Sequence, residues 1–384
     1  MKYRSLTISN EQKLVLLLSS PFCSDCRQEE IQKIIQDKRQ IDLNEVCRLA
    51  LECEVAGFVY RNVKLLALDL KEIKDKLEPV YQEAALNNME ALKETLVVLK
   101  SLSVHDIPVI PLKGVYASDK IFRDFGVYPS SDIDLLVPLN LLEKIKRILE
   151  FECGYTPVEE FSQEDLLDSH YHLIFKRRMT LEVHWNLVKR YFSIPEEFWW
   201  KSALPVEWEG ERIMDLTIEN NILYQIFRLF DHCFYPLRFF VLLSALIEKN
   251  FDQINWGGLI RTADGFGMKK LVLATLNILN DLLGTSLPDV VSRQRTRGYP
   301  LLRRLIFSGI FSGVSRKHLK MMVYTVILIE TKTVVRIFLG RLFPSIGELR
   351  LRYNLPASSS SVYLYYILNP ILLIFNSEDR RKNA

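Results

Sequence analysis

The chain has 384 residues, 48% of them hydrophobic and 25% charged, with a formal net charge of +3. This length allows two or three substructures around a real core, and the composition is that of a folded globular protein rather than a disordered chain. The small net charge conceals an asymmetry. Residues 291–384 contain sixteen Lys and Arg against four Asp and Glu, so they carry +12 and the preceding residues carry −9. Such a basic segment suits a nucleotide, a nucleic acid or an acidic partner, although solvated charges on amphipathic helices are the simpler explanation.

The N-terminus lacks the features of a signal peptide, because residues 1–11 are polar. The most apolar later stretch, 321–339, is interrupted by Glu330, Lys332 and Arg336. Charges at these positions argue against a membrane span. We therefore expect a cytoplasmic protein without a membrane span.

Helical patterning dominates the first part of the chain. Apolar residues recur at intervals of three and four in residues 43–63 and again in 77–102. This spacing places them on one face of a helix. We therefore predict a helical N-terminal region over residues 1–104.

The pattern changes in residues 105–205, where short apolar strands alternate with helical segments. A helix over 141–151 is followed by Gly154, which suits a C-terminal cap. The predicted strands cover residues 108–111, 133–137, 171–175 and 180–184, and the last two form a hairpin. This order predicts an α+β core with a small mixed sheet.

Helical patterning returns from residue 217. The predicted helices include 217–230, 237–249, 256–266 and 271–283, with several more after Pro300. We therefore predict a helical C-terminal region over residues 206–384, which contains the basic segment.

Acidic side chains stand at regular spacing on two predicted strands. Asp132 and Asp134 begin one apolar run, where a period of two puts both on one face and turns Ile133 to the other. On a later strand, Glu182 and His184 also share a face. Three carboxylates so placed are the oxygen ligands that Mg²⁺ prefers.

A glycine turn precedes the first acidic pair. A short apolar strand ends in Lys113 and Gly114, and the missing Cβ of a glycine lets backbone N–H groups approach phosphate oxygens. Ser130 and Ser131, just before the acidic pair, supply hydroxyl donors. These four residues, together with His184, are the candidate nucleotide-binding residues.

The combination suits metal-assisted nucleotidyl transfer, in which an acceptor attacks the α-phosphorus of a nucleoside triphosphate and expels pyrophosphate. Two Mg²⁺ ions held by carboxylates neutralise the triphosphate, align the attack and lower the pKa of the acceptor. Asp132 and Asp134 fit the shared ligands, and Glu182 fits the third carboxylate, which can also serve as the base. Each residue alone is explained by a solvated strand edge, but their common order favours a site.

Three motifs occur in this order: LKG at 112–114, SSDIDLLV at 130–137 and EVHW at 182–185. They resemble the LKG, RxxxDIDLLV and (D/E)xHW signatures of a bacterial nucleotidyltransferase family within the DNA polymerase beta-like nucleotidyltransferase superfamily. The resemblance extends over most of the chain. It implies a polymerase-beta-like core, a triphosphate contact at Gly114, and metal binding by Asp132, Asp134 and Glu182.

The chain departs from the resemblance at two places. Tyr128 stands where members often carry Arg, so the phosphate contact is either missing or supplied by Arg123. The helix over 237–247 lacks an aspartate that members often have. Both departures concern residues expected at the substrate, whereas the residues expected to bind metal are all present.

We therefore expect a Mg²⁺-dependent nucleotidyltransferase that uses ATP or another nucleoside triphosphate. The acceptor remains open among a protein side chain, a metabolite and an RNA end. One alternative is a catalytically inactive protein that binds nucleotide or a partner on the same fold. The other is a helical adaptor whose basic segment binds nucleic acid, although no firm nucleic-acid prediction follows from the sequence.

Overall fold

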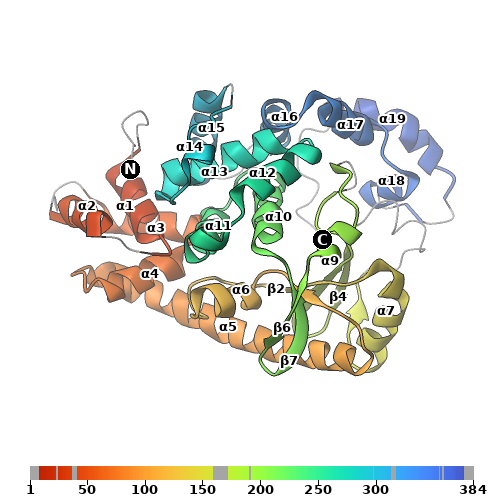
Figure 1. The fold of residues 1–384 in the computed structure, drawn as a ribbon, viewed down its shortest axis with the longest axis horizontal. Helices are drawn as coiled ribbons and strands as arrows, with labels where there is room; N and C mark the ends of the chain where they lie inside the picture. The colour runs from red at the N-terminus through yellow and green to blue at the C-terminus, as the bar shows by residue number, and fades with distance from the viewer. Residues whose placement is uncertain are drawn as a thin grey trace.

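The computed structural model describes residues 8–22, 25–36, 41–158, 172–189, 192–296, 298–312, 317–353, 355–356 and 359–375. The fold is α+β, with a small mixed sheet between helices that precede and follow it in the chain (Figure 1). The predicted fold class is therefore confirmed.

The helices before the sheet are α1 (Asn10–Leu18), α2 (Asp25–Gln36), α3 (Leu43–Glu52), α4 (Ala56–Leu65) and α5 (Lys71–Val104). Helix α1 begins with a capping box, in which Ser9 and Gln12 each accept the other's backbone N–H. With 34 residues, α5 is about 51 Å long at 1.5 Å per residue, and it runs under the whole sheet in Figure 1. The predicted helix over 77–102 lies inside α5, whereas the segment 43–63 is divided between α3 and α4.

The central sheet contains β1 (Ile110–Pro111), β2 (Asp132–Leu136), β3 (Thr156–Pro157), β4 (His172–Lys176) and β5 (Thr180–His184). Their order is β1-β2-β5-β4-β3, and β2 and β5 are parallel while the other pairs are antiparallel. The short α6 (Val115–Ala117) and then α7 (Leu142–Phe151) occupy the connections on either side of β2. All four predicted strands are present, each shifted by at most two residues at either end.

The two faces of β2 have different environments. Ile133 and Leu135 belong to a hydrophobic cluster with residues of α5 and α7. Leu136, on the opposite face, belongs to a second cluster formed mainly by the N- and C-terminal helices. Because side chains alternate along a strand, Asp132 and Asp134 lie on the face that is turned toward this second cluster.

A second sheet, absent from the sequence prediction, is the hairpin of β6 (Leu204–Trp208) and β7 (Glu211–Asp215), which follows the short α9 (Glu197–Lys201). Its strand β6 is mostly exposed and contains Pro205, so it lacks the apolar alternation of a typical strand. The hairpin lies beside the edge of the central sheet, since Met214 N–H donates at 2.9 Å to the O of Val109, the residue before β1. The domain boundary predicted at residue 205 falls inside β6.

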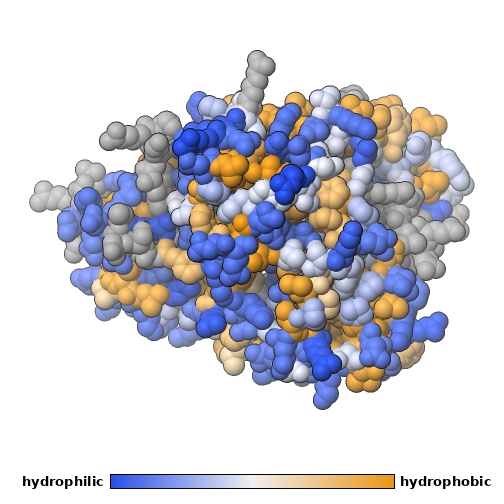
Figure 2. Space-filling model, in the orientation of Figure 1, coloured by the Kyte–Doolittle hydropathy of each residue, from blue (hydrophilic) through white to orange (hydrophobic). Residues whose placement is uncertain are grey.

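The helices after the hairpin are α10 (Ile218–Asp231), α11 (Leu237–Lys249), α12 (Trp256–Gly265), α13 (Lys269–Leu283), α14 (Asp289–Ser292), α15 (Tyr299–Ser312), α16 (Lys317–Leu328), α17 (Thr331–Leu342), α18 (Ile346–Arg352) and α19 (Val362–Phe375). The first four match the predicted helices within two residues. None of the helices in the described ranges is long and apolar enough to cross a membrane. Figure 2 shows hydrophobic residues along the upper right of the face in view, over α16, α17 and α19.

The N- and C-terminal helices share one core, although they are far apart in sequence. Leu14 and Leu17 of α1 belong to the same buried cluster as Leu276 and Leu279 of α13. Arg27 of α2 also links the two regions, because its Nη2 donates a hydrogen bond to Leu283 O at 2.6 Å. The helical regions therefore form one body on the carboxylate-bearing face of β2.

Candidate functional site

The parallel pairing of β2 and β5 brings the predicted carboxylates together. Asp134 lies directly opposite Glu182 in the register of the two strands. The side chain of Asp134 is fully buried, while those of Asp132 and Glu182 are 24% and 23% exposed. The acidic centre is therefore a partly buried group of three carboxylates at the boundary of the sheet.

Lys113 lies between the two aspartates. Its Nζ is 3.1 Å from Asp132 Oδ2 and 2.9 Å from Asp134 Oδ1. Burial alone would lower the pKa of Lys113, but the charges of Asp134 and Asp132 raise that pKa above its ordinary value. The ammonium is therefore charged and holds both carboxylates.

His184 joins the same group from β5. Its Nε2 is 3.1 Å from Asp134 Oδ1 and 3.4 Å from Glu182 Oε2. Burial alone would lower the pKa of His184, but these two carboxylates raise it. Burial would likewise raise the pKa of Glu182, yet the hydrogen bond with His184 and the charge of Lys113 lower it to about 2. Glu182 is therefore ionised at neutral pH.

The glycine turn has a steric role in the structure. Gly114 has φ +60, and a Cβ built on it would lie 2.2 Å from Ser130 Oγ. Ser130 Oγ in turn donates to Asp132 O at 3.1 Å, and Ser131 Oγ donates to Asp132 Oδ1 at 3.3 Å. Gly114 therefore brings the turn after β1 against the residues that begin β2. All five candidate nucleotide-binding residues are gathered around the acidic centre.

The donor set fits a divalent cation. Asp134, Glu182 and His184 each offer a ligand atom, and these atoms lie within 4.8 Å of one another. Asp134 Oδ2 is buried and has no hydrogen-bond partner among the described residues. A buried carboxylate oxygen without a partner is costly unless a cation or water satisfies it. The sequence prediction named Asp132 rather than His184 in this group, and in the structure Asp132 is paired with Lys113.

Tyr128, which stands in place of the arginine, and Arg123, the candidate replacement, lie in different surroundings. Tyr128 is buried, with the Arg238 guanidinium 5.5 Å from its ring centroid. Arg123 is exposed. Among the described residues it forms no ion pair with the carboxylates of the acidic centre. The proposed contribution of Arg123 to phosphate binding therefore has no geometric support.

Sequence reasoning missed a second cation beside the site, Arg228 of α10. Arg228 is only 8% exposed, and its Nη1 donates to Gln225 Oε1 at 2.8 Å. Burial alone would lower the pKa of Arg228, but the Tyr128, Tyr224 and Asp134 side chains raise it. The available signal in the sequence was a single arginine within the otherwise apolar run 226–230 of α10.

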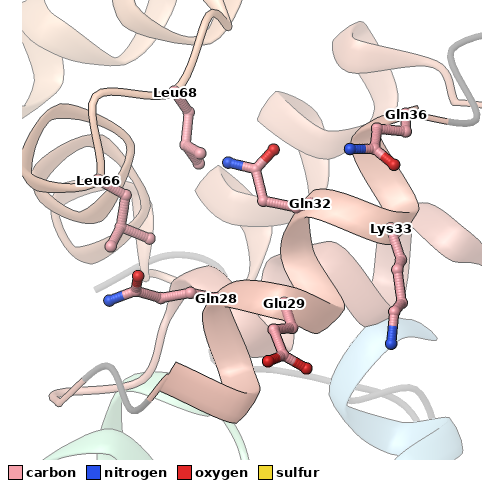
Figure 3. Close-up of a pocket in the computed structure, with 7 residues that line it drawn as sticks. All are labelled: Gln28, Glu29, Gln32, Lys33, Gln36, Leu66 and Leu68. Carbon is pink, nitrogen blue, oxygen red and sulfur yellow. The ribbon is translucent and has the colours of Figure 1, made fainter.

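A separate hollow of about 530 Å³ lies in the N-terminal helices. Figure 3 shows it lined by Gln28, Glu29, Gln32, Lys33 and Gln36 of α2 together with Leu66 and Leu68. None of these residues belongs to the acidic centre. The hollow and the carboxylates are therefore different places on the molecule.

The mixed sheet thus presents three carboxylates, a lysine and a glycine turn in one place. Residues 39–284, more than half of the chain, match the sequence model of a family described as uncharacterised nucleotidyltransferase. The protein therefore belongs to this nucleotidyltransferase family.

A solved structure with some similarity is the solution structure of the antibiotic-resistance factor ANT(2'')-Ia, whose title describes substrate-regulated conformation dynamics. It shares 13% sequence identity and has a TM-score of 0.34, over 46% of this chain and 95% of that one. No curated protein matches the chain.

Proposed function

We propose that the protein transfers a nucleoside monophosphate from a nucleoside triphosphate to an acceptor, with release of pyrophosphate and dependence on Mg²⁺. The observation that carries the proposal is the register of β2 and β5. It places Asp134 opposite Glu182 and leaves the buried Asp134 Oδ2 without a partner. This arrangement, together with membership of a nucleotidyltransferase family, supports the reaction class.

Asp132, Asp134 and Glu182 are the residues that would hold two Mg²⁺ ions. Bound Mg²⁺ supplies charge neutralisation of the triphosphate and a lower pKa for the acceptor. The remaining roles belong to the chain itself. His184 orients Asp134 and Glu182 through its Nε2 contacts, and the low pKa of Glu182 keeps it ionised as a ligand.

The residues around the carboxylates suit the phosphates of the substrate. Lys113 is a point charge on a flexible stem, able to turn from the carboxylates toward a phosphate. Ser130 and Ser131 lie at the start of β2 and carry hydroxyl donors, while Gly114 keeps the turn close to them. The acceptor is an open choice among a protein side chain, a metabolite and an RNA end.

The test is nucleotide transfer by the full chain. Each of the four labelled nucleoside triphosphates is incubated with Mg²⁺ and a cell extract, and both labelled acceptors and released pyrophosphate are measured. The double variant Asp132→Ala with Asp134→Ala should lose both signals. The matched control is Asp264→Ala, which removes a carboxylate from an exposed pair with Lys269. Activity that survives in the double variant refutes the proposal.

The presence of an internal cation favours one alternative, a protein that binds nucleotide without turnover. Lys113 already neutralises Asp132 and Asp134, so nucleotide binding need not await a metal. Calorimetry separates the two functions. Tight nucleotide binding in EDTA, with no pyrophosphate released to any acceptor in Mg²⁺, supports the alternative.

A further inference from the structure

Arg228 is a buried guanidinium near the acidic centre that no ion pair neutralises. Within the described residues, no carboxylate forms an ion pair with it, and its recorded contacts are neutral side chains. Its guanidinium lies 4.3 Å from the ring centroid of Phe239, and Nη1 is held by Gln225. Burying a cation without a paired anion costs free energy. Because Arg228 is only 8% exposed, we expect an anionic ligand to pair with it.

The fold holds this part of α10 against the site by two fixed contacts. At the end of α10, Asp231 Oδ1 lies 2.5 Å from the Nζ of Lys189, five residues after the last residue of β5. On α11, Arg238 Nη1 donates to Pro129 O at 2.8 Å, directly before Ser130. The Phe239 ring is close to both guanidinium groups, since that of Arg238 is 5.2 Å from its centroid. These contacts hold α10 and α11, the helices around Arg228, against the segments that precede β2 and follow β5.

Two cations, Arg228 and Lys113, lie within electrostatic reach of Asp134. The charge of Asp134 acts on both side chains. Lys113 already forms ion pairs with two carboxylates, whereas Arg228 forms none among the described residues. A guanidinium presents a planar set of donors that matches phosphate oxygens, and phosphate would relieve the repulsion between the two cations.

We propose that Arg228 and Lys113 together bind the terminal phosphates of the nucleoside triphosphate, and therefore the pyrophosphate that leaves. This inference rests on the proposed function, and it assigns to a helix of the C-terminal region a part of the substrate site. Arg228 takes the place of an arginine contact that the loop before β2 lacks, because Tyr128 stands there.

Inorganic pyrophosphate is the probe, because it carries the phosphates without a base. Its affinity is measured by calorimetry in EDTA for the wild type, Arg228→Gln, Arg228→Lys and the control Arg293→Gln. The control removes one exposed arginine, paired with Asp289, and so changes the net charge equally. Arg228→Gln should weaken pyrophosphate binding by about tenfold to a hundredfold, the loss expected for charge-assisted hydrogen bonds. Arg228→Lys should weaken it less, and Arg293→Gln should leave it unchanged.

The outcomes separate this inference from the proposed function. Thermal melting without ligand checks whether each variant is folded. If Arg228→Gln unfolds, Arg228→Lys, which keeps the positive charge, is used in its place. A purely structural Arg228 lowers the melting temperature of its variants but leaves their pyrophosphate affinity at the wild-type value, which overturns the inference alone. A wild type that binds neither pyrophosphate nor any nucleoside triphosphate in Mg²⁺ overturns the proposed function as well.

Discussion

Replacement of Lys113 by methionine tests whether its ammonium occupies the place of a metal ion. The change keeps most of the side-chain volume and removes the charge that lies 3.1 Å from Asp132 and 2.9 Å from Asp134. It leaves two aspartates and Glu182 without their shared cation. Removal of one partner from a buried ion pair costs about 3–5 kcal/mol of unfolding free energy. Because Lys113 and Asp132 are partly exposed, we expect a loss of about 3 kcal/mol in metal-free protein.

Mg²⁺ should reverse most of that loss. A ligand at one hundred times its dissociation constant stabilises the folded state by about 2.7 kcal/mol. In the wild type the ion must first displace Lys113, whereas in Lys113→Met it enters carboxylates that no lysine holds. The gain in unfolding free energy on addition of Mg²⁺ should therefore be larger in the variant than in the wild type.

Urea unfolding followed by tryptophan fluorescence, in EDTA and in Mg²⁺, measures the four free energies. The control is Lys269→Met, which removes an exposed lysine paired with Asp264 and should change neither value appreciably. An equal gain from Mg²⁺ in the wild type and in Lys113→Met would refute the reasoning, because Lys113 would then not compete with the ion.

Three further outcomes follow from the same site. Gly114→Ala should lower the unfolding free energy by about 1–3 kcal/mol, because its φ is positive and its Cβ meets Ser130 Oγ; Ser130→Gly in the same chain should restore part of this loss in urea melts. The raised pKa of His184 stabilises the fold below its ordinary value of 6.5, and this contribution is lost as pH rises through the raised pKa; stability measured against pH in EDTA should lose that slope in His184→Gln. The pKa of Glu182, lowered from 4.5 to about 2, contributes stability above pH 4.5 that is lost as pH falls through about 2; its size is on the order of 3 kcal/mol, and a Glu182→Gln profile that keeps the acid slope would contradict this assignment.

Local pattern was sufficient for the strands and helices that carry the carboxylates. The run after Asp132 and the alternation around Glu182 predict β2 and β5, and the apolar spacing of 237–249 predicts α11 with its observed bounds. Period-two alternation also placed Asp132 and Asp134 on one face. These features depend on neighbours within a few residues in the chain, and such local patterns can be read from a single sequence.

The parts that escaped prediction depend on contacts between distant segments. The parallel register that puts Asp134 opposite Glu182 is set by packing of the whole sheet, so the sequence predicts the shared faces but not the pairing. Arg228 lies 94 positions after Asp134 in the chain, and only the docking of α10 brings the two together. The hairpin β6–β7 was missed because Pro205 and exposed polar residues weaken its strand pattern. The metal-binding and catalytic roles themselves stay predictions.

The two faces of β2 also have a mechanical meaning. Ile133 and Leu135 anchor the strand to the cluster below the sheet, while Phe239 and Leu136 belong to the cluster of the helical body. Strand β2 is thus packed into both hydrophobic clusters, so the carboxylates stand where the sheet and the helical body meet. Because one strand is packed into both clusters, the separation between the carboxylates and Arg228 depends on core packing on both faces of the sheet.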